Sequence, residues 1–154
     1  FGMNLNISDM QAAVGCAQLK KLPLFVAGRR RNFGRLWQGM QPVADKFILP
    51  EPLAGSRPSW FGFMLTCRHG ISRDSVVRYL EAKGIQTRML FAGNIVRQPC
   101  FDELRDGSAG YRIAGSLSNT DRIMQDTFWV GVYPGLTDAQ IDYIVRMLKE
   151  AVKK

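Results

Sequence analysis

Two arginines and two amide side chains gather in the stretch 87–98, which reads Thr-Arg-Met-Leu-Phe-Ala-Gly-Asn-Ile-Val-Arg-Gln. Arg88 and Arg97 bracket an apolar turn, and Asn94 and Gln98 add groups that donate and accept hydrogen bonds. A planar guanidinium can bind a carboxylate or a phosphate through two parallel hydrogen bonds. We therefore interpret this stretch as a candidate site for an anionic ligand.

A second interpretation of the same arginines stays open. They could form ion pairs with Asp102 and Glu103, which follow a few positions later. The surrounding segment 91–118 is rich in Gly and polar residues and is long for a passive connection. A connection of this length often carries function, so we expect short helix and loop there with a functional role.

Groups that could do covalent or metal chemistry are scarce. His69 is the only histidine and stands in a Cys-Arg-His-Gly turn, where we expect an exposed loop residue. Cys16, Cys67 and Cys100 are odd in number and widely spaced, which argues against disulfides and zinc and favours three reduced thiols in the core. Nothing matches a nucleophile elbow or a Gly-rich phosphate loop. We predict no catalytic residue and no metal ligand in this chain.

The elements that position the candidate site begin with a helical arm over residues 1–41. Ser8 and Gln11 have the spacing of a capping box, and apolar residues recur at helical intervals after them. Pro23 marks the place where a second helix begins or the first one bends. The arm is therefore a bent helix or a pair of helices.

Residues 42–154 are expected to form a small α/β domain. Ser72 can cap one helix, and Thr137 with Gln140 forms a capping box for another that runs to about residue 152. A short helix is predicted over 119–126, and apolar runs bounded by turn residues predict strands at 46–49, 60–67, 85–90 and 127–132. Helices packed on one face of a small antiparallel or mixed sheet give a two-layer α/β sandwich of the α+β class.

The net charge of +8 could indicate a nucleic-acid ligand, a phosphorylated ligand or neither. The basic run Arg29, Arg30, Arg31 and Arg35 fits the solvated side of an amphipathic helix, and no nucleic-acid-binding module accompanies it. No apolar run is long enough to span a membrane, and the start lacks a signal peptide. We expect a cytoplasmic protein without nucleic-acid or membrane partners, and part of a longer polypeptide because an initiating Met is absent.

Four segments of the sequence carry a further signal: Gly2–Gly15, Pro58–Phe63, Gly84–Pro99 and Asp126–Leu136. Together they resemble one enzyme family, the fold-type-I sugar aminotransferases of the DegT/DnrJ/EryC1/StrS type. The versions Leu-Phe-Ala-Gly-Asn and Thr-Phe-Trp-Val-Gly-Val-Tyr-Pro-Gly-Leu are most similar to the branch of CDP-4-keto-6-deoxy-D-glucose 3-dehydrases of lipopolysaccharide biosynthesis. The resemblance covers essentially the whole chain.

The resemblance implies a small C-terminal domain that covers the active site of a homodimeric enzyme. Pyridoxal or pyridoxamine 5'-phosphate would be held mainly by an upstream domain, together with the cofactor lysine of aminotransferases or the histidine that replaces it in dehydrases. It also implies a nucleotide-sugar substrate. A flavin or iron–sulfur reductase partner, and a 2Fe-2S cluster on upstream cysteines, are further possibilities in some dehydrases. The fragment alone would be inactive.

The resemblance also assigns roles to individual residues. Asn4 matches a family residue that reaches across the dimer to the cofactor phosphate, although Met3 stands where the family usually has Tyr. The arginines and amides of 87–98 match the segment facing the sugar nucleotide. Trp60 and Trp129 are expected to anchor strands in the core. A nucleotide-sugar aminotransferase and a free-standing nucleotide- or nucleic-acid-binding module remain alternatives.

Overall fold

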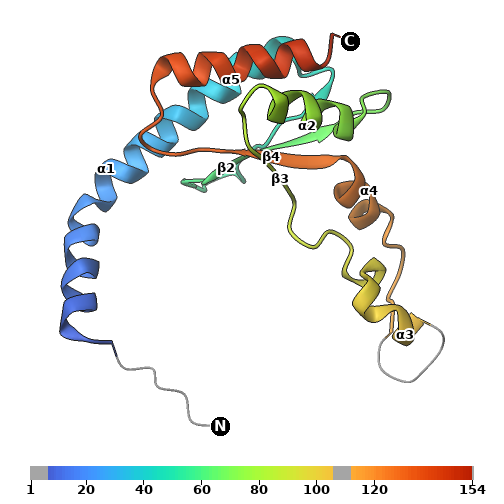
Figure 1. Cartoon of the computed structure of the whole chain (residues 1–154), viewed down its shortest axis with the longest axis horizontal. Coiled ribbons are helices and arrows are strands. Elements are labelled where there is room, and N and C mark those ends of the chain that lie inside the picture. Colours follow the sequence, from blue (N-terminus) through green and yellow to red (C-terminus); the bar gives the residue numbers. More distant parts are fainter. Residues whose placement is uncertain (1–6, 106–111, 154) are drawn as a thin grey trace.

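A single long helix opens the part of the chain that the computed structural model describes, residues 7–105 and 112–153. Helix α1 (Asp9–Met40) begins at the expected capping box, where the side chains of Ser8 and Gln11 each accept a hydrogen bond from the other's backbone N–H. Pro23 lies inside this helix, so of the two arrangements left open by the sequence the single bent helix is observed. Figure 1 shows that α1 changes direction in its N-terminal half, as expected where proline removes a helical hydrogen bond.

Four antiparallel strands form one sheet in the order β1-β2-β4-β3. Each lies within a predicted strand segment, so the existence and order of the strands are confirmed, with shorter ends. Successive residues of a strand face opposite sides of the sheet, which divides the strands into an inner and an outer set of side chains. The strands are β1 (Phe47–Ile48), β2 (Gly62–Cys67), β3 (Thr87–Met89) and β4 (Thr127–Gly131).

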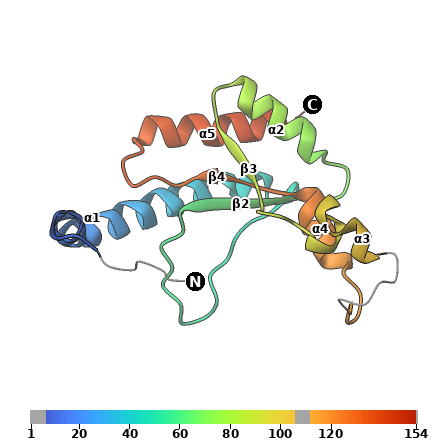
Figure 2. The same cartoon turned by 60° about the horizontal axis from the view of Figure 1, so that its bottom comes forward.

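One face of the sheet is covered by α2 (Arg73–Ala82), α5 (Asp138–Ala151) and the C-terminal half of α1 (Figures 1 and 2). The core between the layers contains side chains with no exposed surface, each stabilising the fold by roughly 1.5–3 kcal/mol through burial. They include Leu36, Phe63, Leu65, Leu80, Phe128 and Leu148. The expected two-layer sandwich is confirmed. The predicted division into an arm (1–41) and a small domain (42–154) falls at the end of α1 and stays a prediction.

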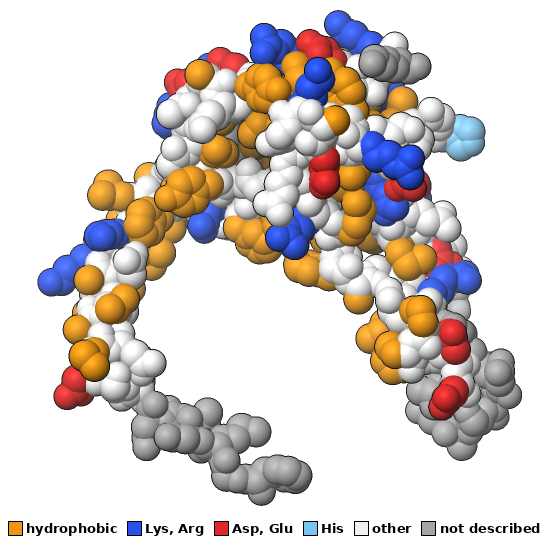
Figure 3. All heavy atoms as spheres, in the orientation of Figure 1, with side chains coloured by type: hydrophobic (Ala, Val, Ile, Leu, Met, Phe, Trp, Pro, Cys, Tyr) orange, Lys and Arg blue, Asp and Glu red, His pale blue; other side chains and the backbone are white. Residues whose placement is uncertain are grey.

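The opposite face of the sheet carries no helix of the described chain. Beyond one end of the sheet lies a second projection, built from the 3-10 helices η2 (Ile95–Arg97) and η3 (Pro99–Phe101), with α3 (Asp102–Arg105) and α4 (Ser118–Asp126). Figure 3 shows the resulting arch, with apolar side chains exposed along the left limb, on the inner edge of the right limb and on the underside of the central body. The uncovered sheet face therefore forms the roof of a concave surface.

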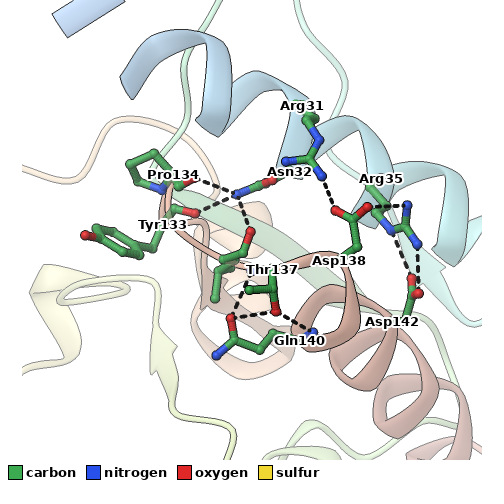
Figure 4. Close-up of polar contacts among 10 residues, drawn as sticks. Arg31, Asn32, Arg35, Tyr133, Pro134, Thr137, Asp138, Gln140 and Asp142 are labelled. Carbon is green, nitrogen blue, oxygen red and sulfur yellow. Dashed lines mark hydrogen bonds and ion pairs between the residues drawn. The ribbon is translucent and has the colours of Figure 1, made fainter. Parts of the chain in front are cut away.

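Asn32 fastens α1 to the turn that follows β4 (Figure 4). Its side chain is 0% exposed, and its Nδ2 donates to the carbonyl oxygens of Tyr133 at 2.8 Å and Pro134 at 3.3 Å. Gly28 permits the same approach from one turn earlier, because a Cβ there would lie 3.0 Å from the Pro134 oxygen. The close contact of helix and turn therefore depends on an amide and a missing side chain.

The basic side of α1 is largely exposed, as expected, and its arginines also pair with other elements of the fold. Arg31 and Arg35 pair with Asp138, and Arg35 also donates two hydrogen bonds to Asp142, both acidic residues lying near the start of α5 (Figure 4). The hydrogen bond from Arg35 lowers the pKa of Asp142 and raises the pKa of Arg35 itself. Arg30 donates to backbone carbonyls of the 57–58 segment. These arginines join elements of the fold and do not form a free basic patch.

The cysteines are free thiols, but only Cys67 lies in the core; Cys16 and Cys100 are exposed, so the expectation of three core thiols is wrong for both. Burial raises the pKa of Cys67 to about 11. His69 is exposed in the turn between β2 and α2, as expected. None of the described helices is long and apolar enough to cross a membrane.

Candidate functional site

Arg88 lies on the uncovered face of the sheet, above the concave surface, in a row of side chains that runs across strands β3, β4 and β2. It is directly opposite Trp129 in the β3–β4 pairing, and Trp129 is opposite Met64 in the β2–β4 pairing. Directly opposed residues of an antiparallel pair point to the same side of the sheet. The exposed Arg88 side chain makes no hydrogen bond or ion pair with another described residue. Its guanidinium is therefore available to an anion.

An apolar pocket of about 270 Å³ lies beside this row. Four aromatic rings contribute to its lining, and its one charged lining residue is Glu51. Trp129 can lie flat against β2 because Gly62 has no side chain: a Cβ there would be 2.7 Å from Cε3 of the indole. The aromatic and aliphatic side chains around the pocket are Trp60, Phe61, Met64, Leu90, Phe91 and Trp129.

The two tryptophans are half-buried and line this pocket, so the expectation that they are core anchors is wrong. Trp60 packs against Phe33 with ring centroids 4.7 Å apart, and Trp129 meets Phe61 edge-on at 5.3 Å. Both geometries are favourable for aromatic pairs. The rings of Trp60, Phe61 and Trp129 thus form one wall of the pocket.

The turn after β3 holds Phe91 in an uncommon backbone conformation. Its φ of 48° lies in the left-handed region, where a bulky residue is a rare outlier. The turn is closed by hydrogen bonds from the Phe91 amide to the Met89 carbonyl at 2.8 Å and from the Gly93 amide to the Leu90 carbonyl at 3.1 Å. The Gln98 side chain also donates to the Ala92 carbonyl. The Phe91 ring, 78% exposed, is presented at the pocket by a tightly tied turn.

Asn94 and Arg97 are joined through Asp121 of α4. The Arg97 guanidinium donates two hydrogen bonds of 2.7 Å to the Asp121 carboxylate, and the Asn94 side chain donates a third of 2.7 Å. Arg97 first, and Asn94 second, lower the pKa of Asp121 to about 2. The partner of Arg97 is thus neither Asp102 nor Glu103. Sequence reasoning missed Asp121, which lies 24 residues from Arg97.

The candidate residues therefore separate into different settings. Arg88 faces the concave side with a free guanidinium, whereas Asn94 is 2% exposed and, with Arg97, fastens the 91–98 segment to α4. Gln98 ties the preceding turn. Direct contact of Asn94, Arg97 and Gln98 with a ligand stays a prediction. Asn4 lies outside the described residues, so its predicted role also stays a prediction.

The lining of the apolar pocket does not suit a metal ion or the phosphate of a cofactor. Within the described ranges, no three His, Cys, Asp or Glu side chains stand close enough to hold a metal ion. The apolar pocket has no lysine in its lining, and its only charge is the negative Glu51, which does not fit a phosphate group. The chain thus presents a cation beside an aromatic pocket, a combination suited to binding an anionic ligand with an apolar part.

Comparison with known proteins gives a consistent result. The family model for the DegT/DnrJ/EryC1/StrS aminotransferases matches residues 1–149. The lipopolysaccharide biosynthesis protein RfbH of Salmonella typhimurium is 48% identical, covering 97% of this chain and 34% of its own length. The dTDP-4-dehydro-2,6-dideoxy-D-glucose 3-dehydratase of Saccharopolyspora spinosa is 45% identical, with coverages of 99% and 32%.

The fold is shared with a solved structure of the Escherichia coli GDP-4-keto-6-deoxy-D-mannose-3-dehydratase with bound hydrated pyridoxal phosphate. The TM-score is 0.81 at 26% identity, and the match covers 96% of this chain and 36% of that one. The chain spans about a third of the length of the curated relatives it matches. On the family match, the sequence identities and the common fold, this chain belongs to the DegT/DnrJ/EryC1/StrS aminotransferase family.

Proposed function

We propose that this chain forms the substrate-gripping part of a nucleotide-sugar 3-dehydratase that uses pyridoxamine or pyridoxal 5'-phosphate. The observation that carries the proposal is the 45% identity, over 99% of the chain, to an enzyme named as a sugar 3-dehydratase. The 48% identity to a lipopolysaccharide biosynthesis protein supports a role in making a deoxysugar for that polymer. The specific substrate proposed is CDP-4-keto-6-deoxy-D-glucose, which loses its C3 hydroxyl.

In this proposal, Arg88 binds the diphosphate of the substrate. A guanidinium suits this task because it stays charged and can donate two parallel hydrogen bonds to phosphate oxygens. Its exposed position on the concave side, without a partner among the described residues, supports the assignment. The sugar-nucleotide would then lie across the uncovered face of the sheet, under the arch seen in Figure 3.

The cofactor would be bound by residues outside those described, because the pocket beside Arg88 does not fit its phosphate. When bound, such a cofactor supplies an electron sink for removing the sugar hydroxyl. The chain's own contribution is to bind and orient the sugar-nucleotide. A homodimer, a reductase partner and an iron–sulfur cluster on other cysteines belong to the same proposal.

Product analysis of the complete enzyme that contains this chain tests the proposed reaction. Incubated with CDP-4-keto-6-deoxy-D-glucose, pyridoxamine phosphate and a reductant, it should yield a sugar that has lost its C3 oxygen, measured by mass spectrometry and NMR. A 4-amino sugar formed in the presence of glutamate would instead identify an aminotransferase. We expect the isolated 154-residue chain to show neither turnover nor the absorbance of bound vitamin B6 cofactor.

A further inference from the structure

We propose that Arg73 is a positioning residue for the substrate surface, meaning the uncovered face of the sheet and its pocket. It fixes helix α4 and, through Met124, the turn 91–94 beside the pocket. This inference rests on the proposed function, because it concerns how the chain holds the surface that grips the nucleotide sugar. Arg73 lies in the first turn of α2, and its partner in α4 lies 51 residues away. The contact therefore joins the helix layer to the second projection.

Arg73 caps the C-terminal end of α4. Its Nη1 donates a hydrogen bond of 2.6 Å to the carbonyl oxygen of Met124, and its side chain is only 18% exposed. The last carbonyl groups of a helix have no partner within the helix, and a cation near them is favourable because the helix dipole is negative there. None of the residues in the last turn of α4 is basic. Arg73 therefore supplies from α2 the charge and the donor that this helix end lacks.

Asp74 orients the Arg73 guanidinium. The Nε and Nη2 of Arg73 donate to one carboxylate oxygen of Asp74 at 3.0 and 2.8 Å, which leaves Nη1 for the Met124 carbonyl. The hydrogen bonding from Arg73 also lowers the pKa of Asp74. A lysine would keep the positive charge but presents a single nitrogen in place of the planar fork. The arrangement therefore calls for an arginine at this position.

Met124 carries the contact on to the substrate surface. Its side chain packs on the backbone of Gly93, where a Cβ would lie 2.4 Å from Cγ, and its Sδ accepts a hydrogen bond of 3.4 Å from the Asn94 amide. One residue therefore meets Arg73 through its carbonyl group and the turn 91–94 through its side chain. A displacement of α4 would be passed directly to this turn.

The turn 91–94 has a strained backbone that depends on such support. Phe91 has a φ of 48°, and its side chain lines the pocket. An unfavourable conformation of this kind persists only where surrounding contacts enforce it. The packing of Met124 on Gly93 is one of those contacts, so loosening α4 should let the turn relax and the Phe91 ring move. A less ordered surface binds its ligand more weakly, because ordering it on binding costs entropy.

Steady-state kinetics of the complete enzyme that contains this chain test the role of Arg73, with CDP-4-keto-6-deoxy-D-glucose as the substrate. We expect Arg73→Ala to raise KM about three- to tenfold and to change kcat by less than about twofold, because the surface binds the substrate while other residues hold the cofactor. Arg73→Lys should raise KM about two- to threefold. Arg78→Ala, which changes an exposed arginine of the same helix, should leave both constants unchanged.

A purely structural role for Arg73 would give a different pattern. It would reduce the fraction of folded enzyme, which lowers the apparent kcat and leaves KM unchanged. An unchanged KM in Arg73→Ala, or in Arg73→Lys if the alanine variant does not fold, therefore overturns the proposal.

A double-mutant cycle with Met124→Ala tests the route through Met124. If Arg73 acts through this residue, the KM of the double variant should stay within about twofold of the larger single effect. Single effects that multiply would show that Arg73 acts independently of Met124, which also overturns the proposal.

A second measurement needs no substrate, so it separates this inference from the proposed function. Labelling the methionine methyl groups of the complete enzyme with ¹³C gives NMR signals for Met124 and for Met64, which lines the pocket together with Phe91. Met124→Leu and Met64→Leu variants assign the two signals. We expect Arg73→Ala to shift both, because a displaced aromatic ring changes the magnetic field at a neighbouring methyl group, and Arg78→Ala to shift neither.

The two measurements can fail separately. If the wild-type enzyme does not convert the CDP-sugar, the proposed function fails, and the methyl signals alone decide the role of Arg73. A Met64 signal that Arg73→Ala leaves unchanged would contradict the positioning role, whether or not the enzyme converts this substrate.

Discussion

Replacing Asn32 should destabilise the fold more than its single amide suggests. In Asn32→Ala, the carbonyl oxygens of Tyr133 and Pro134 lose a donor that lies at 2.8 and 3.3 Å and has no exposed surface. The lost hydrogen bonds and the unpaired carbonyl groups together should lower the free energy of unfolding by about 2–3 kcal/mol. For a chain of this size, each kcal/mol lowers Tm by about 2–4 °C, so we expect a decrease of about 4–12 °C.

Thermal unfolding followed by circular dichroism measures this decrease, and Gln38→Ala is the matched control. Gln38 is an exposed amide on the same part of α1, and its side chain makes no hydrogen bond with another described residue. Its replacement should change the free energy of unfolding by less than about 0.5 kcal/mol. A Tm for Asn32→Ala within about 1 °C of the wild type would refute the reasoning.

Asn32→Asp tests the role of the Asn32 donor through the pH dependence of Tm. The new carboxylate would face two carbonyl oxygens in a buried place, which raises its pKa in the folded state above the ordinary value. At a pH above the ordinary pKa of Asp, ionisation of this carboxyl therefore destabilises the fold. The stability is regained as pH falls, because the protonated carboxyl can again donate a hydrogen bond. The Tm difference from wild type should shrink between about pH 7 and about pH 4. A difference that does not change with pH would show that the Asn32 donor is unimportant.

Three further predictions concern the site and its supports. Arg97 lowers the pKa of Asp121 to about 2, below its ordinary 3.8, so the ionised carboxylate stabilises the fold above about pH 4. This contribution is lost as pH falls toward about 2. Asp121→Asn should therefore remove that part of the acid-induced decrease in Tm. Gly62→Ala should displace the Trp129 indole, seen as a changed near-UV circular dichroism spectrum, and destabilise the fold by about 1–3 kcal/mol; an unchanged spectrum would contradict the close packing. Buried Cys67, with its pKa raised to about 11, should not react with Ellman's reagent at pH 8 in the native chain, whereas the two exposed thiols should.

Local signals in the sequence predicted most of the elements. The capping boxes at Ser8 and Thr137 are formed by residues three positions apart, so their geometry is decided within one helical turn. Apolar runs located all four strands, because a strand that packs one face on a core must present apolar residues there. These patterns depend only on near neighbours, which is why they could be read without a structure.

Contacts between distant residues could not be read in the same way. Arg35 meets Asp142 across 107 residues, so its role in joining α1 to α5 was hidden behind an ordinary basic run. The exposure of Trp129 on the uncovered face follows from strand register, which a one-residue shift would reverse. The strained backbone at Phe91 leaves no trace in residue type, since Phe rarely adopts it.

The central claim is that the exposed guanidinium of Arg88 on the concave face binds the diphosphate of the substrate. Calorimetric titration of the complete enzyme with CDP-6-deoxy-D-glucose tests it most directly, with Arg78→Ala, an exposed arginine of α2, as the matched control. Losing charge-assisted hydrogen bonds should make the Arg88→Ala variant bind about 10- to 100-fold more weakly while its Tm stays that of the control. Equal affinity in both variants would contradict the account.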